Sequence, residues 1–137
     1  TNAQVGQGAD VVYAAAGGTG IGVLQAAADA GKLSIGVDSN QNHLQPGSVL
    51  TSMLKRVDVA VFDAMNDGMS DDEFAFGVQV LGVAEEGVGL AMDENNADLV
   101  NEEMMKAVED ARAMIISGEI SVHDFRTDST CPYGSVG

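Results

Sequence analysis

Basic residues are scarce in this 137-residue sequence, and their scarcity argues against one large class of partner. Lysine and arginine total 6 against 21 aspartates and glutamates, which gives a formal net charge of −15 at pH 7. A surface this acidic repels phosphate backbones and anionic membranes. We therefore expect no nucleic-acid partner, and the acidity by itself identifies no substrate.

Cysteine and long apolar runs are also nearly absent. Cys131 is the single cysteine, which excludes an internal disulfide and a multi-cysteine metal site. His43 and His123 are far apart in the sequence and are expected in loops, so we predict no metal site and no cofactor. No stretch approaches the roughly 20 apolar residues that a membrane-spanning helix requires.

The composition is that of one packed α/β domain, with 45% hydrophobic and 20% charged residues. Residues 10–15 form an apolar run closed by Gly17-Gly18, which predicts a buried strand of a parallel sheet. A helix over 19–30 and a second strand that ends at Asp38 should follow. This order is typical of a βαβ unit.

The next segment predicts a loop, a third strand and a second long helix. Residues 39–47 are rich in Asn, Gln and Ser and close with Pro-Gly, so they should form a loop. Residues 49–54 are a strand candidate. The helix that follows should present an apolar face made of Val57, Ala60, Val61, Ala64 and Met65.

The last third predicts a hairpin and a final helix. Two short apolar segments, 76–83 and 87–91, are separated by a polar turn and should pair with each other. Asn101 should cap a helix over 102–117. The stripe that we expect this helix to bury consists of Met104, Met105, Val108, Ala111, Ile115 and Ile116.

The glycine-rich turn at 17–20 is the most informative local feature, because it places backbone N–H groups at the amino end of a helix. A nicotinamide-dinucleotide-binding Rossmann enzyme is one alternative, since Gly18, Gly20 and Asp38 nearly fit its fingerprint. The third glycine would fall at Val23, however, and no Tyr-x-x-x-Lys pair is present. In a second alternative the glycines only permit close packing, Asp38 caps a turn, and the chain is a non-binding structural fragment.

Three stretches in order, 8–20, 35–41 and 50–58, resemble the basic membrane protein family, and 87–91 and 115–120 are similar to its closing segments. These are the substrate-binding lipoproteins of ABC importers, typified by purine nucleoside receptors. The resemblance implies an α/β fold of the periplasmic-binding-protein type I-like, flavodoxin-like class, with a mostly parallel sheet. It also implies a function in solute binding rather than catalysis.

The resemblance further implies a site between two lobes that close over a nucleoside. Gly17 and Gly18 would line the cleft, Asp38 would accept hydrogen bonds from the ribose hydroxyls, and Lys55 would donate to the sugar from the opposite wall. An ABC transporter permease would be the partner. An extracytoplasmic location would follow, as a periplasmic or membrane-anchored lipoprotein.

The family's chain path implies a division of this sequence between the lobes. Residues 1–47 and 77–122 would belong to the second, carboxyl-terminal lobe, 48–76 would cross to the first, and 123–137 would form a tail. Because the family's amino-terminal lobe has no counterpart here, we expect a partial sequence or a chain that pairs with a complementary piece. The strand at 49–54 would then lack sheet partners, and the apolar face of the following helix would be exposed.

Overall fold

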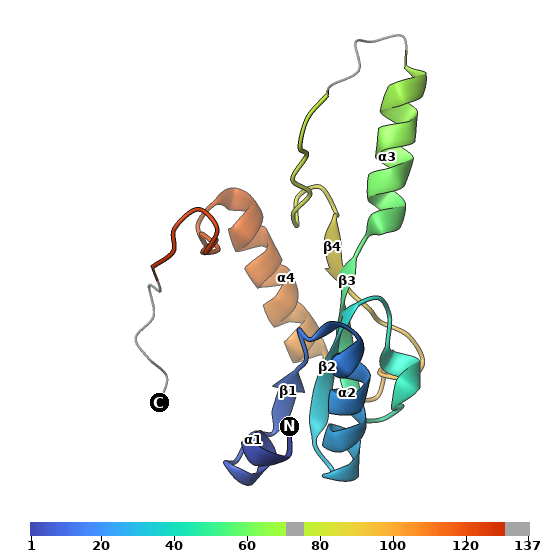
Figure 1. The fold of residues 1–137 in the computed structure, drawn as a ribbon, viewed down its shortest axis with the longest axis vertical. Helices are drawn as coiled ribbons and strands as arrows, with labels where there is room; N and C mark the ends of the chain where they lie inside the picture. Colours follow the sequence, from blue (N-terminus) through green and yellow to red (C-terminus); the bar gives the residue numbers. More distant parts are fainter. Residues whose placement is uncertain (71–75, 131–137) are drawn as a thin grey trace.

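The computed structural model describes residues 1–70 and 76–130. Its elements, in chain order (Figure 1), are α1 (Asn2–Gly6), β1 (Val11–Tyr13), the 3-10 turn η1 (Gly17–Thr19), α2 (Gly20–Asp29), β2 (Leu33–Asp38), the 3-10 turn η2 (Asn42–Leu44), β3 (Val49–Lys55), α3 (Val57–Met69), β4 (Val88–Leu90) and α4 (Glu102–Ser117). None of the described helices combines the length and the apolar character that crossing a bilayer demands.

The four described strands form one sheet in the order β1-β2-β3-β4. The first three are parallel to one another, with Tyr13 beside Ile35 and Asp38 beside Leu54, and β4 runs antiparallel to β3. The predicted α/β fold with a mixed, mostly parallel sheet is therefore confirmed. Each parallel connection passes through a helix or a 3-10 turn, as parallel strands require a crossover.

The core is small and lies between α2 and one face of the sheet. Leu24 and Ala27 of α2 are buried against β1 and β2, whose Val12 and Ser34 are also buried. The apolar spacing along α2 places these side chains on one stripe, which explains why the sequence predicted this helix closely. The packing of α2 fixes the two strands whose ends carry the candidate site.

The strand at 49–54 does not lack sheet partners, and that expectation is wrong. β3 lies inside the sheet, with β2 on one side and β4 on the other. The loop after β2 is long enough to return the chain alongside it, and Val49 and Ser52 of β3 are buried. The division of 48–76 from the rest of the chain stays a prediction.

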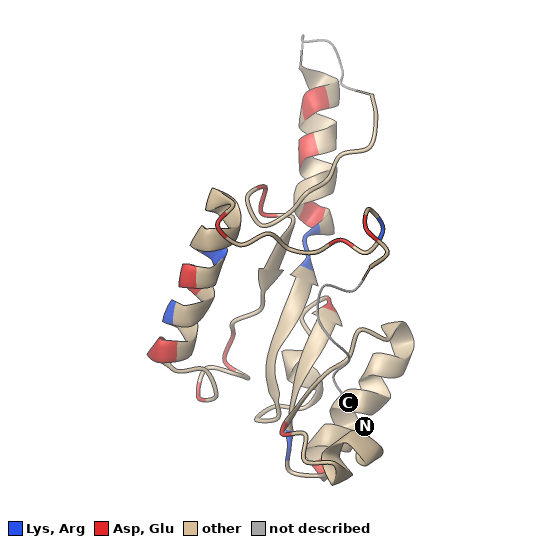
Figure 2. Cartoon of the chain, turned by 90° about the vertical axis from the view of Figure 1, so that its left-hand side faces the viewer, with Lys and Arg blue, Asp and Glu red and all other residues tan. Residues whose placement is uncertain are grey.

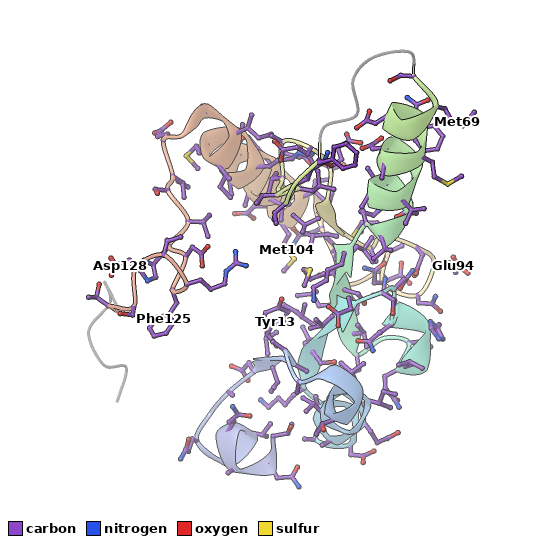
Figure 3. All side chains as sticks on the ribbon, turned by 45° about the horizontal axis from the view of Figure 1, so that its top comes forward. Tyr13, Met69, Glu94, Met104, Phe125 and Asp128 are labelled. Carbon is purple, nitrogen blue, oxygen red and sulfur yellow. The ribbon has the colours of Figure 1, made fainter. Side chains whose placement is uncertain are left out.

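Helix α3 does expose its apolar face, as expected. It contains no buried residue and projects away from the sheet (Figure 1). Val57, Val61 and Met65 are each more than half exposed. Figure 3 shows Met69 at its outer end, far from the core around α2.

The predicted hairpin is wrong, because only its second half is a strand. Residues 76–83 form no strand, and the Val78 side chain is 96% exposed. Val88–Leu90 pairs with β3 instead. The chain reverses just before β4 through a tight turn in which the Gly87 N–H donates to the Gly82 carbonyl at 2.9 Å.

Helix α4 has the predicted bounds and cap but not the predicted burial. The Asn101 side chain accepts a hydrogen bond from the Met104 N–H at 2.8 Å. No residue of α4 is buried, and Met104, Val108 and Ile116 are all substantially exposed. The stripe instead borders an open groove of about 510 Å³ between α4 and the strands β3 and β4.

Candidate ligand-binding site

The site residues expected from the resemblance follow the carboxyl ends of three adjacent strands. Gly17 and Gly18 lie in η1 after β1, Asp38 ends β2, and Lys55 ends β3. Because β1, β2 and β3 are parallel, these ends meet at one edge of the sheet. Ligands of open parallel α/β sheets bind at this edge.

Asp38 and Lys55 form an ion pair at this edge, with 2.7 Å between Asp38 Oδ1 and Lys55 Nζ. The hydrogen bond that the Lys55 ammonium donates to Asp38, and then the charge of Asp38, raise the pKa of Lys55 above its ordinary value of 10.5. The Asp38 side chain is 49% exposed and the Lys55 side chain is 60% exposed, so a solute can reach both. The two groups were expected on opposite walls of a cleft, but they end neighbouring strands and are in direct contact.

The backbone at Asp38 is unusual. Its φ is 72°, in the left-handed region that non-glycine residues rarely adopt. The Ser39 N–H donates to the Val37 carbonyl at 2.9 Å, which closes a γ-turn around Asp38. Strained turns of this kind persist where surrounding contacts hold them, and they cluster at functional sites.

The two glycines at the same sheet edge lie in open space. A side chain added at Gly17 or Gly18 would meet no atom within 4 Å, and Gly17 has a φ of 53°. Close packing therefore does not explain these two positions, whereas Gly20 lies against Ala14. The structure leaves the backbone of the turn accessible at this edge of the sheet.

A buried polar network supports the loop after Asp38, and sequence reasoning missed it. Ser52 donates to Asn42 at 2.8 Å, and Asn42 donates to Asp93 at 3.3 Å. The Asn96 amide binds the carbonyl of Ala91 at 3.0 Å. Ser52, Asn42 and Asn96 are fully buried. The Asn-rich composition was the available signal, but composition alone indicated only a loop.

Hydrogen bonds also act on Asp93 at the rim of this network. Asn40 donates to Asp93 Oδ2 at 2.6 Å, and this bond is the main cause that holds the pKa of Asp93 below its ordinary value of 3.8. Asp93 therefore stays ionised and anchors the loop that carries Asn40 to the segment after β4.

Tyr13 is a second residue near the site that sequence reasoning missed. It is the last residue of β1 and is half exposed, on the side of the sheet where α4 begins (Figure 3). It lies close enough to Lys55 to interact with its charge. An aromatic residue at a strand end, just before a glycine turn, was the signal available.

The other charged and metal-ligating side chains form no second candidate site in the described parts of the chain. Arg56 pairs with Asp58 on the surface, at 2.8 Å. Within residues 1–70 and 76–130, no three His, Cys, Asp or Glu side chains gather closely enough to hold a metal ion. Cys131 lies outside the described residues.

Comparisons of this chain with a family model, with curated proteins and with solved structures agree with one another. Residues 3–125 match the family described as ABC transporter substrate-binding protein PnrA-like. The chain is 37% identical over 91 residues to basic membrane protein D of Borreliella burgdorferi, covering 64% of this chain and 27% of that protein. It is 38% identical over 89 residues to an uncharacterised lipoprotein of Pyrococcus furiosus, covering 61% and 22%.

The fold is also similar to a solved ABC transporter solute-binding protein from Aeropyrum pernix, with a TM-score of 0.70 and 28% identity. That similarity covers 91% of this chain and 44% of the solved one. The chain thus spans about a quarter of the length of the two curated relatives and less than half of the solved structure. The motifs, the mostly parallel sheet and the match over residues 3–125 agree, and the chain belongs to the PnrA-like family of ABC transporter substrate-binding proteins.

Proposed function

We propose that this protein acts as the solute-binding component of an ABC importer and binds a purine nucleoside or a related ribose-bearing solute. Asp38, Lys55, Gly17 and Gly18 would contact the ligand. The single observation that carries the proposal is the Asp38–Lys55 contact of 2.7 Å at the carboxyl edge of a parallel sheet.

The ion pair keeps enough hydrogen-bonding capacity for a vicinal diol. A carboxylate has about four lone-pair sites and an ammonium has three N–H donors, and their mutual contact uses one of each. The Asp38 carboxylate can accept from two hydroxyls while Lys55 donates to one of their oxygens. No bond is made or broken in this role, which agrees with a family of solute-binding proteins.

The exposed glycine turn would supply the third side of the sugar site. With no atom within 4 Å of a side-chain position at Gly17 or Gly18, a ligand can approach the backbone itself. Glycine permits this approach because it carries no Cβ. A larger residue there would occupy the open space in front of the turn.

The proposal includes a second lobe and a membrane partner. Residues 1–47 and 77–122 would form one lobe with the site at its edge, and 48–76 would reach the other lobe. The exposed apolar face of α3 supports this division, because a large apolar surface favours contact with another part of a protein. The relatives named as lipoproteins favour an extracytoplasmic location and delivery to an importer permease.

The experiment compares Asp38→Asn with the unchanged chain and with Asp63→Asn, a matched loss of one carboxylate on α3. Inosine, guanosine and free ribose are titrated at millimolar concentrations while amide shifts are followed by NMR. We expect nucleoside binding that Asp38→Asn weakens about tenfold or more, since hydrogen bonds to a charged group are lost. Asp63→Asn should bind as the unchanged chain does.

Two results would contradict the proposal. One is equal nucleoside affinity in Asp38→Asn and the unchanged chain. The other is the absence of any saturable shift near Asp38 with all three ligands, which would favour the non-binding structural alternative.

A further inference from the structure

The γ-turn that carries Asp38 begins where the β1–β2 ladder has ended. The last bond of that ladder joins the Ala14 N–H to the Ile35 carbonyl. The Val37 N–H lies beyond it and donates to Gln41 Oε1 at 2.9 Å. A side chain thus takes the place of β1 on this side of β2, while β3 still pairs with Val37 and Asp38 on the other side.

Gln41 is itself held by the strand that carries Lys55. Its N–H donates to Ser52 Oγ at 3.0 Å, and Ser52 is a fully buried residue of β3. Ser52 in turn donates to the buried Asn42 at 2.8 Å, which fixes the hydroxyl. A continuous series of hydrogen bonds therefore runs from the backbone beside Asp38 to β3, three residues before Lys55.

The space around this connection is full. A Cβ at Gly36 would lie 2.6 Å from Ser52 Oγ and 2.9 Å from Gln41 Oε1. Both distances are shorter than any ordinary contact, so the glycine allows the two polar side chains to pass over β2. The arrangement depends on the three residues together.

We propose that Gln41 is the positioning residue that holds the strained turn at Asp38 and so directs its carboxylate at Lys55. The inference deepens the site on which the proposed function rests, but it concerns the geometry of the ion pair in the absence of ligand. A residue with positive φ stays there only while its surroundings hold it. Without the acceptor at position 41, the Val37 N–H loses its partner and Asp38 relaxes to a negative φ, away from Lys55.

The test compares Gln41→Met, which keeps the length of the side chain but removes the acceptor, with Gln41→Glu, which retains an acceptor oxygen. Gln45→Met is the matched control in the same loop, where the Gln45 side chain donates to exposed Gln25. Two NMR signals report on the site. The intraresidue Hα–HN NOE of residue 38 is strong at positive φ, and the pH titration of the Lys55 side chain reports its ion pair.

We expect the unchanged chain, Gln45→Met and Gln41→Glu to show the strong NOE. In Gln41→Met the NOE should weaken and the Lys55 pKa should fall toward 10.5, while amide shifts in the paired parts of β1 and β2 stay in place. A Gln41→Met protein that keeps both signals overturns the inference.

A measurement on the unchanged chain keeps the inference testable if Gln41→Met does not fold. The Val37 amide should exchange with solvent much more slowly than an unbonded amide, and exchange at the unprotected rate overturns the inference. Both readouts are free of ligand, so they separate this inference from the proposed function. Altered geometry in Gln41→Met together with no nucleoside binding would support the first and reject the second.

Discussion

Asp38 combines two properties that a substitution can separate. Its carboxylate pairs with Lys55, and its backbone has a φ of 72°. Glycine tolerates that φ and alanine does not, although both remove the carboxylate. The family motif predicts a ligand-binding role for Asp38, and that role stays a prediction. The strained turn was not predictable, because nothing in the local sequence demands it.

Replacing Asp38 with glycine and with alanine measures the strain directly. We expect Asp38→Gly to be more stable than Asp38→Ala by about 1–2 kcal/mol in the free energy of unfolding, the approximate cost of the left-handed conformation. Urea denaturation of the two variants provides the comparison. Equal stabilities would mean that the turn relaxes once the carboxylate is gone.

The sequence proposed the candidate site residues, but it did not indicate how the structure holds them. Asp38, Lys55 and the two glycines came from the motifs, and the structure brings them to one sheet edge. Gln41 lay within the same motif, yet its role depends on Ser52, eleven residues away on another strand. That contact requires the register of β2 against β3, which no local pattern encodes.

Among the secondary-structure elements, β4 shows that pairing with a strand distant in the sequence can override the hairpin that the local apolar pattern predicts. Both halves of the predicted hairpin are apolar enough to form strands, but only Val88–Leu90 does so. It pairs with β3, and the Arg56 N–H donates to the Gly87 carbonyl at 2.9 Å to extend that pairing. Helix bounds were predicted well by comparison, since spacing and caps are local properties.

Gly87 should be intolerant of any side chain. A Cβ there would lie 2.4 Å from Leu81 Cβ and 2.5 Å from its carbonyl oxygen, so the turn into β4 would have to shift. We expect Gly87→Ala to lower the free energy of unfolding by about 1–3 kcal/mol, the usual cost of forced overpacking. Thermal or urea denaturation measures this loss.

Gly89 supplies the matched control for that experiment. It lies in the middle of β4, and an added Cβ would meet no atom within 4 Å. Gly89→Ala should therefore leave stability nearly unchanged. If Gly89→Ala is as damaging as Gly87→Ala, the close contact with Leu81 is not the cause.

At the scale of the whole molecule, charge is the dominant feature. Figure 2 shows acidic residues along α3, α4 and the connecting loops, with few basic residues among them. The net charge of −15 is carried by a chain with a small core, a projecting helix α3 and a helix α4 that borders an open groove. The described ion pairs are largely exposed and contribute little, so like-charge repulsion should exceed their attraction.

The folded chain should therefore be stabilised by salt at pH 7. Raising sodium chloride from a few millimolar to about 0.5 M shortens the screening length to a few ångströms and weakens repulsion between distant carboxylates. We expect the Tm to rise, as followed by circular dichroism. A Tm that falls with salt would show that the surface ion pairs outweigh the repulsion.

The arrangement of α4 is the part of the whole molecule that the sequence predicted least well. Its apolar stripe is regular, and a regular stripe indicates burial. In the structure, however, α4 borders an open groove, whereas α3 projects from the sheet with its apolar face exposed, as expected. An apolar stripe indicates that one face of a helix is suited to burial, but it does not indicate which surface packs against that face.

The sequence by itself determined the acidic surface, the bounds of most helices and strands, and the family, because composition, spacing and short motifs act locally. Only the tertiary structure decided that β4 pairs with β3, that Asp38 touches Lys55, and that the Gln41 side chain accepts a hydrogen bond from the backbone next to Asp38. Each of these depends on the register between segments distant in the chain. Register follows from how the strands and α2 pack together, and it cannot be read from any one segment.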